Sequence, residues 1–221
     1  MQLNIDSILS PKYPGLRASI RSITGVTVRK ITPSLEELKK TVVDEVKSNY
    51  ALESLKGVPV LRAYRDFFWR VSIDPTKVRP AAEALIRRIL AGKSIPTIST
   101  LVNAYNLASI QTSIPLAAFD QTRLRGGLLM RAATAGEAFL GIGMDKPMSL
   151  NGGEIVVSDG EKLIAVCPYR DADSSKMTEE TKALVLMVCG CPGIEEASLE
   201  RAEEVAVDFI LRFCGGKSSE S

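Results

Sequence analysis

The chain has 221 residues, of which 45% are hydrophobic and 24% charged, as in an ordinary globular protein rather than a disordered or fibrous one. This length allows one full core or two small lobes, and the formal net charge of +2 is too small to imply nucleic-acid binding by itself. The chain contains no histidine, which excludes every catalytic triad, metal site and general base that depends on histidine.

The first part of the chain predicts two short strands and then a helix. Apolar alternation on both sides of a glycine turn predicts the strands within residues 16–31. Ser34 and Glu37 have the spacing of a capping box, in which Ser34 would accept a hydrogen bond from the amide of Glu37. The apolar residues that follow recur at helical spacing, and Gly57 ends this helix.

Three more helices are predicted before the chain changes character. Residues 60–71 form an apolar and aromatic segment at helical spacing. Pro80 suits the first turn of the next helix, which stops at Gly92. Pro96 then separates that helix from one over residues 98–111.

Beyond Pro115 the sequence predicts strands and a closing helix. The strand segments are LLMRAA, EIVVSD, KLIAVCPY and ALVLMVC, and an amphipathic helix follows from about residue 195 to 213. Helices ahead of a strand-rich middle, without regular alternation of the two, indicate an α+β fold. We expect a single domain over residues 1–214 and a disordered tail over 215–221.

Charged residues are segregated along the chain. Residues 62–93 carry eight basic side chains against three acidic ones, whereas residues 195–208 carry six acids against Arg201. The basic segment predicts either a face that attracts phosphates or the solvated side of ordinary helices. Both interpretations stay open at this point.

The four cysteines are expected to be reduced and buried. No apolar run reaches the ~18 residues of a membrane span and no signal peptide is visible, so we expect a cytoplasmic protein. No C-x-x-C pair exists, and neither a metal nor another cofactor is expected. A disulfide from Cys189 or Cys191 to Cys214 remains open for a protein from a hyperthermophile.

Generic motifs for phosphate and ester chemistry are absent. The chain has no phosphate loop of the G-x-x-x-x-G-K-[ST] type, no dinucleotide fingerprint and no G-x-S-x-G elbow. Two glycine pairs, Gly126-Gly127 and Gly152-Gly153, are typical of turns between strands. These patterns alone predict no particular reaction.

A longer segment, residues 66–120, resembles the B3/4 family. The family block D-P-[ST]-x-x-R-P-[SA]-x-E-A-L-x-R-R-I matches residues 74–89, and its l-V-D-x-x-N block is similar to residues 101–106. The Q-P-L-H-A-F-D signature is similar to residues 114–120. Downstream, MRAATAGEAF, IVVSD and SLERAEEVAVDFI resemble further family elements, so the resemblance extends over residues 16–213.

The B3/4 domain is the editing module of the phenylalanyl-tRNA synthetase β subunit. The resemblance therefore implies helices packed on mixed β-sheets, and hydrolysis of the ester between a wrong amino acid and the 3′ adenosine of tRNA. No catalytic or anticodon-binding module fits in the remaining residues, so we expect a domain that edits in trans with tRNA as its partner.

The resemblance places the family's pocket between two sheets and maps three of its polar positions. The pocket asparagine falls on Asn106, and Asn103 lies in the same block. The family histidine falls on Ala117, and the glutamate that reads a tyrosine hydroxyl falls on Met187. A glycine-rich loop is replaced by VCPYR at residues 166–170. We therefore expect specificity shifted away from tyrosine, unless Met187 only fills the core.

An aminoacyl ester is labile, so a protein that positions a water and stabilises an oxyanion can hydrolyse it. Asn106 is the candidate for orienting that water or the ester carbonyl, or else a structural amide. Glu137 and Glu154 are candidate bases or ammonium ligands, although acids at turns are more commonly surface residues. The glycines at 126–127 or 152–153 would allow the protein backbone to approach the adenosine closely.

Arginines of the basic segment are the candidate phosphate contacts. Phe68 and Trp69 are candidates for stacking on a base, but aromatic residues in such a run are more commonly core. Arg79, the arginine of the R-P motif, has an alternative, structural role as an ion-pair partner of Glu83. The candidates are Arg62, Arg65, Arg79, Arg87 and Arg88.

Two other functions compete with the hydrolase. The chain would be a non-catalytic tRNA-binding, RNA-binding or regulatory module if it kept the fold after losing the histidine. It would be a small-molecule binder, of a free amino acid or a nucleotide, if the pocket kept only recognition.

Overall fold

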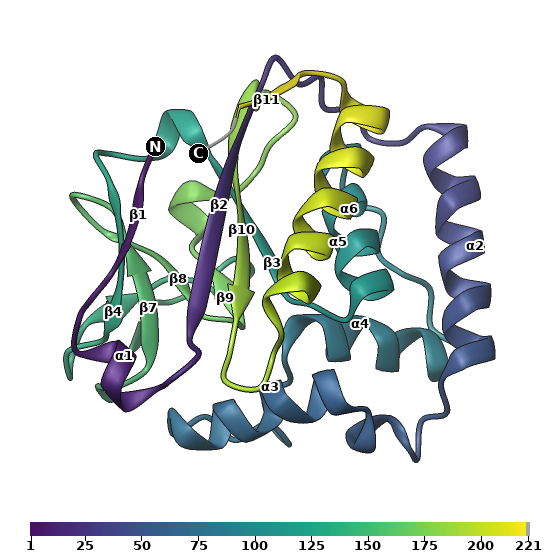
Figure 1. Cartoon of the computed structure of the whole chain (residues 1–221). Helices are drawn as coiled ribbons and strands as arrows, with labels where there is room; N and C mark the ends of the chain where they lie inside the picture. The colour runs from purple at the N-terminus through teal and green to yellow at the C-terminus, as the bar shows by residue number, and fades with distance from the viewer. Residues whose placement is uncertain (220–221) are drawn as a thin grey trace.

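The structure is a computed structural model that describes residues 1–219. Two β-sheets pack face to face, and helices cover the outer side of one of them (Figure 1). The helices are α1 (Leu9–Lys12), α2 (Pro33–Asn49), α3 (Pro59–Arg70), α4 (Ala81–Leu90), α5 (Thr100–Thr112) and α6 (Glu196–Cys214), with 3-10 turns η1 (Leu55–Gly57), η2 (Gln121–Arg123) and η3 (Asp173–Ser175).

The strands form two larger sheets and one small hairpin. The first sheet has the order β1-β4-β7-β8-β9, and only its β1–β4 pair is parallel within the described residues. The second sheet has the order β11-β2-β10-β3 and is antiparallel. The strands are β1 (Leu3–Ile5), β2 (Arg17–Thr24), β3 (Leu116–Asp120), β4 (Leu128–Ala132), β5 (Ala138–Phe139), β6 (Met148–Ser149), β7 (Ile155–Ser158), β8 (Leu163–Val166), β9 (Arg170–Asp171), β10 (Ala183–Gly190) and β11 (Lys217–Ser219).

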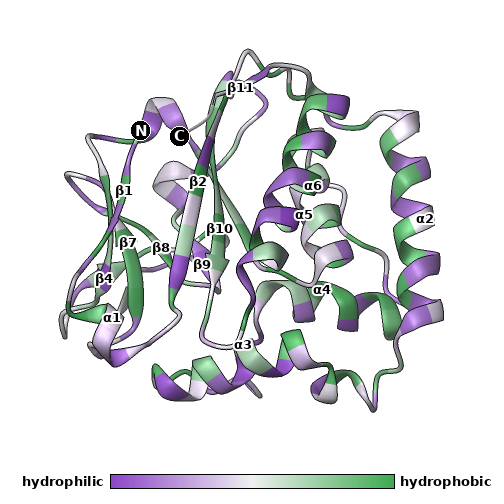
Figure 2. Cartoon of the chain, viewed as in Figure 1, coloured by the Kyte–Doolittle hydropathy of each residue, from purple (hydrophilic) through white to green (hydrophobic). Residues whose placement is uncertain are grey.

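The layers follow one another across the molecule. In Figure 1 the first sheet is on the left, the second sheet is central, α5, α6 and α2 stand to the right, and α3 and α4 lie beneath. Figure 2 shows hydrophobic colour on the central strands β7 and β10 and hydrophilic colour on much of α6. The predicted α+β fold with helices on mixed sheets is therefore confirmed.

The strand β10 is the centre of the second sheet. It pairs along its whole length with β2 and along five residues with β3. Residues 184–190 are all buried, because the first sheet covers one of its faces and the helices cover the other. The hydroxyl of Tyr64 in α3 donates a hydrogen bond of 2.5 Å to the carbonyl of Cys189, which attaches the lower helices to this strand.

The helices agree with the sequence except at the two ends of the first. The prediction that this helix ends at Gly57 is wrong: α2 ends at Asn49, because Tyr50 adopts extended backbone (φ −131°, ψ 147°), and residues 55–57 form the separate turn η1. Helical segments predicted over 60–71, 98–111 and 195–213 correspond to α3, α5 and α6. The capping-box prediction is wrong, because α2 begins at Pro33 after Thr32 and no side chain caps it. Pro33 takes the first helical position, which its fixed φ favours, so Ser34 already lies inside the helix.

Residues 16–31 form one strand instead of the predicted two. After β2, the chain turns at Gly25 (φ 74°) and makes hydrogen bonds outside the sheet. The amide of Thr27 donates to the carbonyl of Cys214, and Arg29 exchanges hydrogen bonds with Thr100. These bonds satisfy the backbone without a second strand.

The tail prediction differs from the structure at residues 217–219. These residues form β11, which pairs with Ser22–Thr24 on the outer edge of β2. An edge strand offers unpaired backbone groups, and Gly215 and Gly216 with positive φ turn the chain onto it. The last two residues of the expected tail lie outside the described part of the chain.

The cysteines Cys167, Cys189, Cys191 and Cys214 are free and buried, as predicted, and the open alternative of a disulfide is not formed. Among residues 1–219, no group of three or more cysteine, aspartate or glutamate side chains is placed to hold a metal ion. Over the same range, no helix is both long enough and apolar enough to cross a bilayer.

A buried carboxylate joins the two lower helices. Glu83 in α4 is fully buried and accepts hydrogen bonds from Arg65 of α3 at 3.0 Å and from Arg87 at 2.6 Å. Both arginine side chains are themselves largely buried. Removing a single member of such a group leaves uncompensated charge in the interior, which is strongly destabilising.

We expect Glu83→Gln to lower the free energy of unfolding by about 3 kcal/mol, because two largely buried guanidinium groups lose their counter-charge. Urea denaturation followed by circular dichroism measures the change. Glu53→Gln is the matched control, since Glu53 is exposed in the loop before η1 and should cost less than about 0.5 kcal/mol. Equal stability of the two variants would contradict this role for Glu83.

Candidate functional site

Ala117 and Met187, two positions that the resemblance assigns to the family pocket, are direct partners on β3 and β10. Directly paired residues project to the same face of a sheet. Both side chains are buried, and Met187 also pairs with Ile20 on β2. The structure therefore brings the two positions together, with an apolar side chain at each.

A small cavity lies between the two sheets beside Ala117. Its volume is about 20 Å³, which is enough for about one water molecule. It is too small for an amino-acid side chain in this conformation, and Met187 does not line it. We call it the inter-sheet cavity; it is lined by Pro115, Leu116, Ala117, Ala165, Val166, Cys167, Pro168, Tyr169, Asp171 and Cys189.

Asp171 brings a carboxylate to this cavity from β9, on the first sheet. Burial raises the pKa of Asp171 to about 7, and a hydrogen bond from the backbone of Ala118 acts in the opposite direction. A carboxyl that titrates near neutrality and borders a cavity has the properties of a general base or acid. Tyr105 of α5 is close enough that burial first, and then the charge of Asp171, raise the pKa of its hydroxyl.

The thiols near the cavity are poor nucleophiles. A hydrogen bond with Cys189, together with burial, raises the pKa of Cys167 well above its ordinary value. Burial raises the pKa of Cys191 to about 12. A thiolate is the reactive form of cysteine, so these side chains stay protonated and unreactive at neutral pH.

The asparagines predicted for the site belong to the helical layer. Asn103 is buried near the start of α5, where its Oδ1 accepts a hydrogen bond of 3.1 Å from the amide of Ile98. Its Nδ2 is buried without a partner among the described residues. Asn106 lies half-buried on the same helix and does not line the inter-sheet cavity. The catalytic role predicted for Asn106 thus has no support from this cavity.

The two predicted glutamates stabilise turns. Glu137 pairs with Arg131 at 2.6 Å and accepts a hydrogen bond from the amide of Thr134, and these contacts, chiefly that with Arg131, lower its pKa. Glu154 is buried, and its two oxygens accept hydrogen bonds from the amides of Asn151 and Gly152 at 2.8 Å. Neither carboxylate lines the inter-sheet cavity, and both are already engaged by local donors.

The glycine pairs lie in turns, away from the cavity. Gly126 has a φ of 69° and precedes β4 beside Gly127, and both are exposed. Gly152 and Gly153 have φ values of 95° and 91° in the turn before β7. A Cβ on Gly152 would lie 3.0 Å from the backbone nitrogen of Ala135, so the turn itself requires glycine.

The predicted arginines separate into three groups. Arg65 and Arg87 bind Glu83, so the alternative pairing of Arg79 with Glu83 is wrong. Arg62 is exposed and lies 3.7 Å from Asp66 on the same helix. Arg88 is exposed at the far end of α4 and donates to the carbonyl of Ser94. Arg79 is exposed, with no ion pair or side-chain hydrogen bond among the described residues.

A second hollow, here called the basic pocket, opens next to the inter-sheet cavity. Its volume is about 430 Å³, and Tyr169 lines both hollows. Wider grooves of about 720 and 610 Å³ run along β2, but there Glu203 already binds Ser19 and Arg21. The basic pocket is lined by Lys77, Val78, Arg79, Ala81, Ala84, Arg87, Tyr169 and Arg170.

Sequence reasoning missed Asp171, Tyr169 and Arg170 as site residues. The only signal was that VCPYR replaces a glycine-rich loop in the family pattern. That departure lies in the segment that lines the inter-sheet cavity, but nothing in it showed that β9 would approach β3. The aromatic prediction fits better: Phe67 and Phe68 are core residues, while Trp69 is exposed.

Comparisons with known proteins agree on one relationship. A family profile described as "B3/4 domain" matches residues 63–215. The chain is 25% identical over 216 residues to the phenylalanine–tRNA ligase beta subunit of Thermotoga maritima, covering 95% of this chain and 26% of that protein. It is 31% identical over 142 residues to the subunit of the same name from Cereibacter sphaeroides, covering 64% and 17%.

A solved structure shows the same fold. An N-terminal fragment of the phenylalanyl-tRNA synthetase beta-subunit from Pyrococcus horikoshii superposes with a TM-score of 0.52 at 13% identity, covering 98% of this chain and 50% of that one. The likeness at this identity concerns the fold alone. The chain spans about a quarter of the length of the Thermotoga relative.

The raised pKa of Asp171 predicts a pH-dependent effect on stability. Its folded-state pKa of about 7 lies above the ordinary value of 3.8, so the native state keeps a proton that the unfolded chain releases between these values. Asp171 therefore lowers stability progressively as the pH rises through this window. We expect Asp171→Asn to be more stable than the wild type, by a margin that grows from about pH 4 to pH 7 and then stays constant.

Urea denaturation of both proteins at four pH values measures this margin. Asp173→Asn is the matched control, because Asp173 lies two residues further on and pairs with Lys176 at the surface. A margin for Asp171→Asn that is the same at pH 4 and pH 7 would contradict a half-buried carboxyl with a raised pKa.

Proposed function

The chain belongs to the B3/4 domain family, and from this membership we propose that it hydrolyses the ester bond of mischarged aminoacyl-tRNA. The observation that carries the proposal is the carboxylate of Asp171, which borders the inter-sheet cavity together with Ala117. The family histidine would stand at Ala117, so a titratable group from the opposite sheet compensates for its loss. The partner is the aminoacylated 3′ end of a tRNA.

Asp171 acts as the general base in this reaction. Its carboxylate accepts a proton from a water molecule as the water oxygen attacks the ester carbonyl carbon. The tetrahedral intermediate then collapses, the bond to the ribose oxygen breaks, and that oxygen takes up the proton. The products are a free amino acid and an intact tRNA hydroxyl. A general base of this kind contributes roughly 10²–10⁴ to the rate.

The substrate must widen the inter-sheet cavity to reach Asp171. The present volume of about 20 Å³ holds the attacking water but not the amino acid. Tyr169 forms the side of the cavity toward the basic pocket, since it lines both, and the next residue, Arg170, lines the basic pocket. Displacement of this segment by the incoming strand is therefore the opening step of the proposal.

The apolar lining favours small or apolar amino acids over tyrosine. Ala117, Ala165 and Val166 offer no side-chain acceptor for a tyrosine hydroxyl, and Asp171, the carboxylate of the lining, is occupied by the attacking water in this mechanism. Burying an unpaired hydroxyl is costly. Met187 is fully buried within the sheet and outside the lining, which favours core filling as its role. The shift in specificity thus rests on the cavity and not on a contact from Met187.

A non-catalytic tRNA-binding module is the second candidate. The observation in its favour is the closed inter-sheet cavity, which lacks both the histidine and the glutamate of the family pattern. Such a module would bind aminoacylated and uncharged tRNA alike. It would release no amino acid from either.

A panel of tRNAs carrying a wrong amino acid tests the hydrolase. We expect release of amino acid from at least one member, and a decrease of about 100-fold or more in Asp171→Asn because the base is lost. Rates are measured after subtraction of spontaneous hydrolysis. Asp173→Asn is the control and should keep the wild-type rate. If no member of the panel releases amino acid although a tRNA–protein complex forms, the hydrolase is contradicted and the non-catalytic binding module is supported.

The pH dependence of deacylation identifies the base. Because the ionised form of Asp171 is the active one, we expect the enzymatic rate to rise about tenfold per pH unit below pH 7 and to level off above it. The wild type and Asp173→Asn should share this profile. A rate that is flat between pH 5 and 7 would remove Asp171 from the reaction.

Substrate choice is tested with the same tRNA charged either with tyrosine or with an apolar amino acid. We expect the apolar ester to be hydrolysed at least about 10-fold faster, because the cavity leaves a tyrosine hydroxyl unpaired. Competition with a tyrosyl and a phenylalanyl ester isolates the contribution of the hydroxyl group. Faster hydrolysis of the tyrosyl ester would contradict the proposed specificity.

A further inference from the structure

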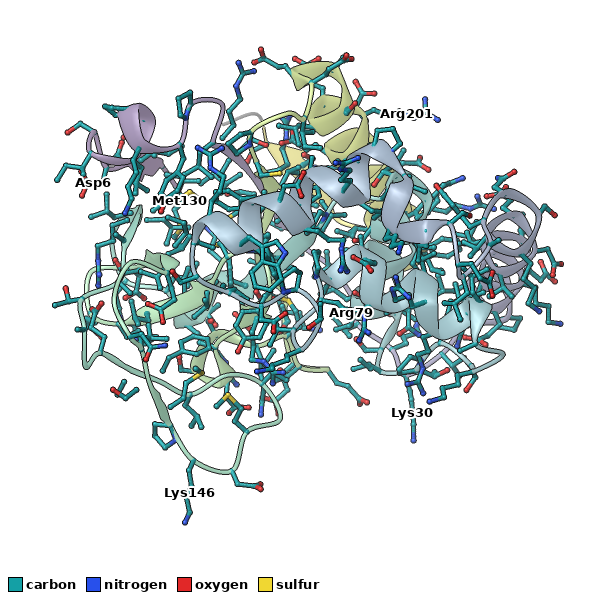
Figure 3. All side chains as sticks on the ribbon, turned by 90° about the horizontal axis from the view of Figure 1, so that it is seen from below. Asp6, Lys30, Arg79, Met130, Lys146 and Arg201 are labelled. Carbon is teal, nitrogen blue, oxygen red and sulfur yellow. The ribbon has the colours of Figure 1, made fainter. Side chains whose placement is uncertain are left out.

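Four cations surround the basic pocket, and none of its lining residues is acidic. They are Lys77, Arg79, Arg87 and Arg170, and they come from segments far apart in the sequence. Figure 3 shows this lower face, with Arg79 near the middle of the view, between the helices and the strands. A concave surface lined by one sign of charge concentrates ions of the opposite sign.

The cations differ in how far their charge is already neutralised. Arg87 is paired with the buried Glu83 at 2.6 Å. Lys77 is 83% exposed, and its ion pair with Asp74 is long, at 3.9 Å. Arg79 has no ion pair among the described residues. The exposed charges of Lys77 and Arg79 are therefore available to a ligand from solvent.

Arg170 lines the pocket, and two contacts hold its side chain in place. Its guanidinium lies 5.4 Å from the centre of the Tyr169 ring and donates to the carbonyl of Ile142 at 2.9 Å. Its Nε is buried and has no hydrogen-bond partner among residues 1–219. A buried donor without a partner costs free energy unless a ligand or water accepts from it.

The start of α4 adds backbone donors to the same pocket. Ala81 and Ala84 line it, and Pro80, the residue before the helix, provides no side-chain cap. The amides of residues 81–83 precede the first hydrogen bond of the helix, which the amide of Ala84 donates to the carbonyl of Pro80, and they have no intrahelical acceptor. Such amides, together with the helix dipole, favour an anion.

We propose that the basic pocket binds a phosphate group of an RNA strand. The inference deepens the proposed function, because Tyr169 lines both this pocket and the inter-sheet cavity. A strand whose phosphate is held by Arg79, Lys77 and the first turn of α4 has its adjoining nucleotide beside Asp171. The planar guanidinium of Arg79 suits two phosphate oxygens at once.

Binding is measured without reference to catalysis. Inorganic phosphate, adenosine monophosphate and a short uncharged RNA ending in CCA are titrated into the ¹⁵N-labelled protein. We expect the amide signals of residues 81–84 and 170 to shift with all three probes, and to shift at the lowest concentration with the RNA. Fluorescence anisotropy of the labelled RNA gives its affinity.

The variant Arg79→Gln is compared with Arg88→Gln. Both remove one positive charge, and Arg88 lies at the opposite end of α4 outside the pocket. We expect Arg79→Gln to weaken RNA binding by about 10-fold and to reduce the slope of log affinity against log salt by about one. Arg88→Gln should change the affinity less than about 2-fold. Both should melt as the wild type does.

Equal losses in the two variants, or no shift at residues 81–84 with any probe, would overturn the site. Shifts with free phosphate alone, without RNA binding, would overturn its assignment to nucleic acid. A failure to deacylate any tRNA does not affect these measurements. The phosphate site and the hydrolase activity are therefore tested by separate measurements.

Discussion

Burial of β10 on both faces is the constraint on which the rest of the structure depends. Residues 184–190 have no side exposed to solvent, so both neighbouring layers must be apolar and closely packed. Gly190 shows how close the packing is, since a Cβ there would lie 2.5 Å from the Cδ1 of Leu199 in α6. Tyr64 holds the lower helices to the same end of the strand. The positions around Ala117 and Met187 lie in this packed layer, so the polar groups near them must come from other elements.

The chemistry of the site follows from that constraint. With alanine and methionine on the second sheet, the polar atoms of the inter-sheet cavity come mainly from residues 167–171 on the first sheet. A carboxylate that approaches a packed sheet loses hydration, which is the reason why the pKa of Asp171 rises to about 7. A hydrogen bond with Cys189, together with burial, raises the pKa of the Cys167 thiol, and burial raises that of Cys191 to about 12. The packed interface thus favours the protonated form of the carboxyl group and of both thiols.

Much of the fold was predictable, because the helices show their apolar periodicity locally. The strand β3 was not predicted, since LAAFD is buried at every residue and so lacks the alternation that marks a half-exposed strand. The site was harder: Glu137 and Glu154 have the right chemistry, but neighbouring donors in their own turns use it. Asp171 became a candidate only through the approach of β9 to β3, a contact between residues more than fifty positions apart, which no local pattern encodes.

The segment Tyr169–Asp171 is the physical link between the two hollows. Tyr169 lines both, Arg170 lines the basic pocket, and Asp171 lines the inter-sheet cavity. Alternate residues of a strand point to opposite faces, so consecutive residues of β9 can serve two compartments at once. An anion that binds Arg170 competes with the carbonyl of Ile142 for a hydrogen bond from the guanidinium. Arg170 itself lies between Tyr169 and Asp171 in the chain. Occupation of the basic pocket and opening of the inter-sheet cavity therefore act on the same three residues.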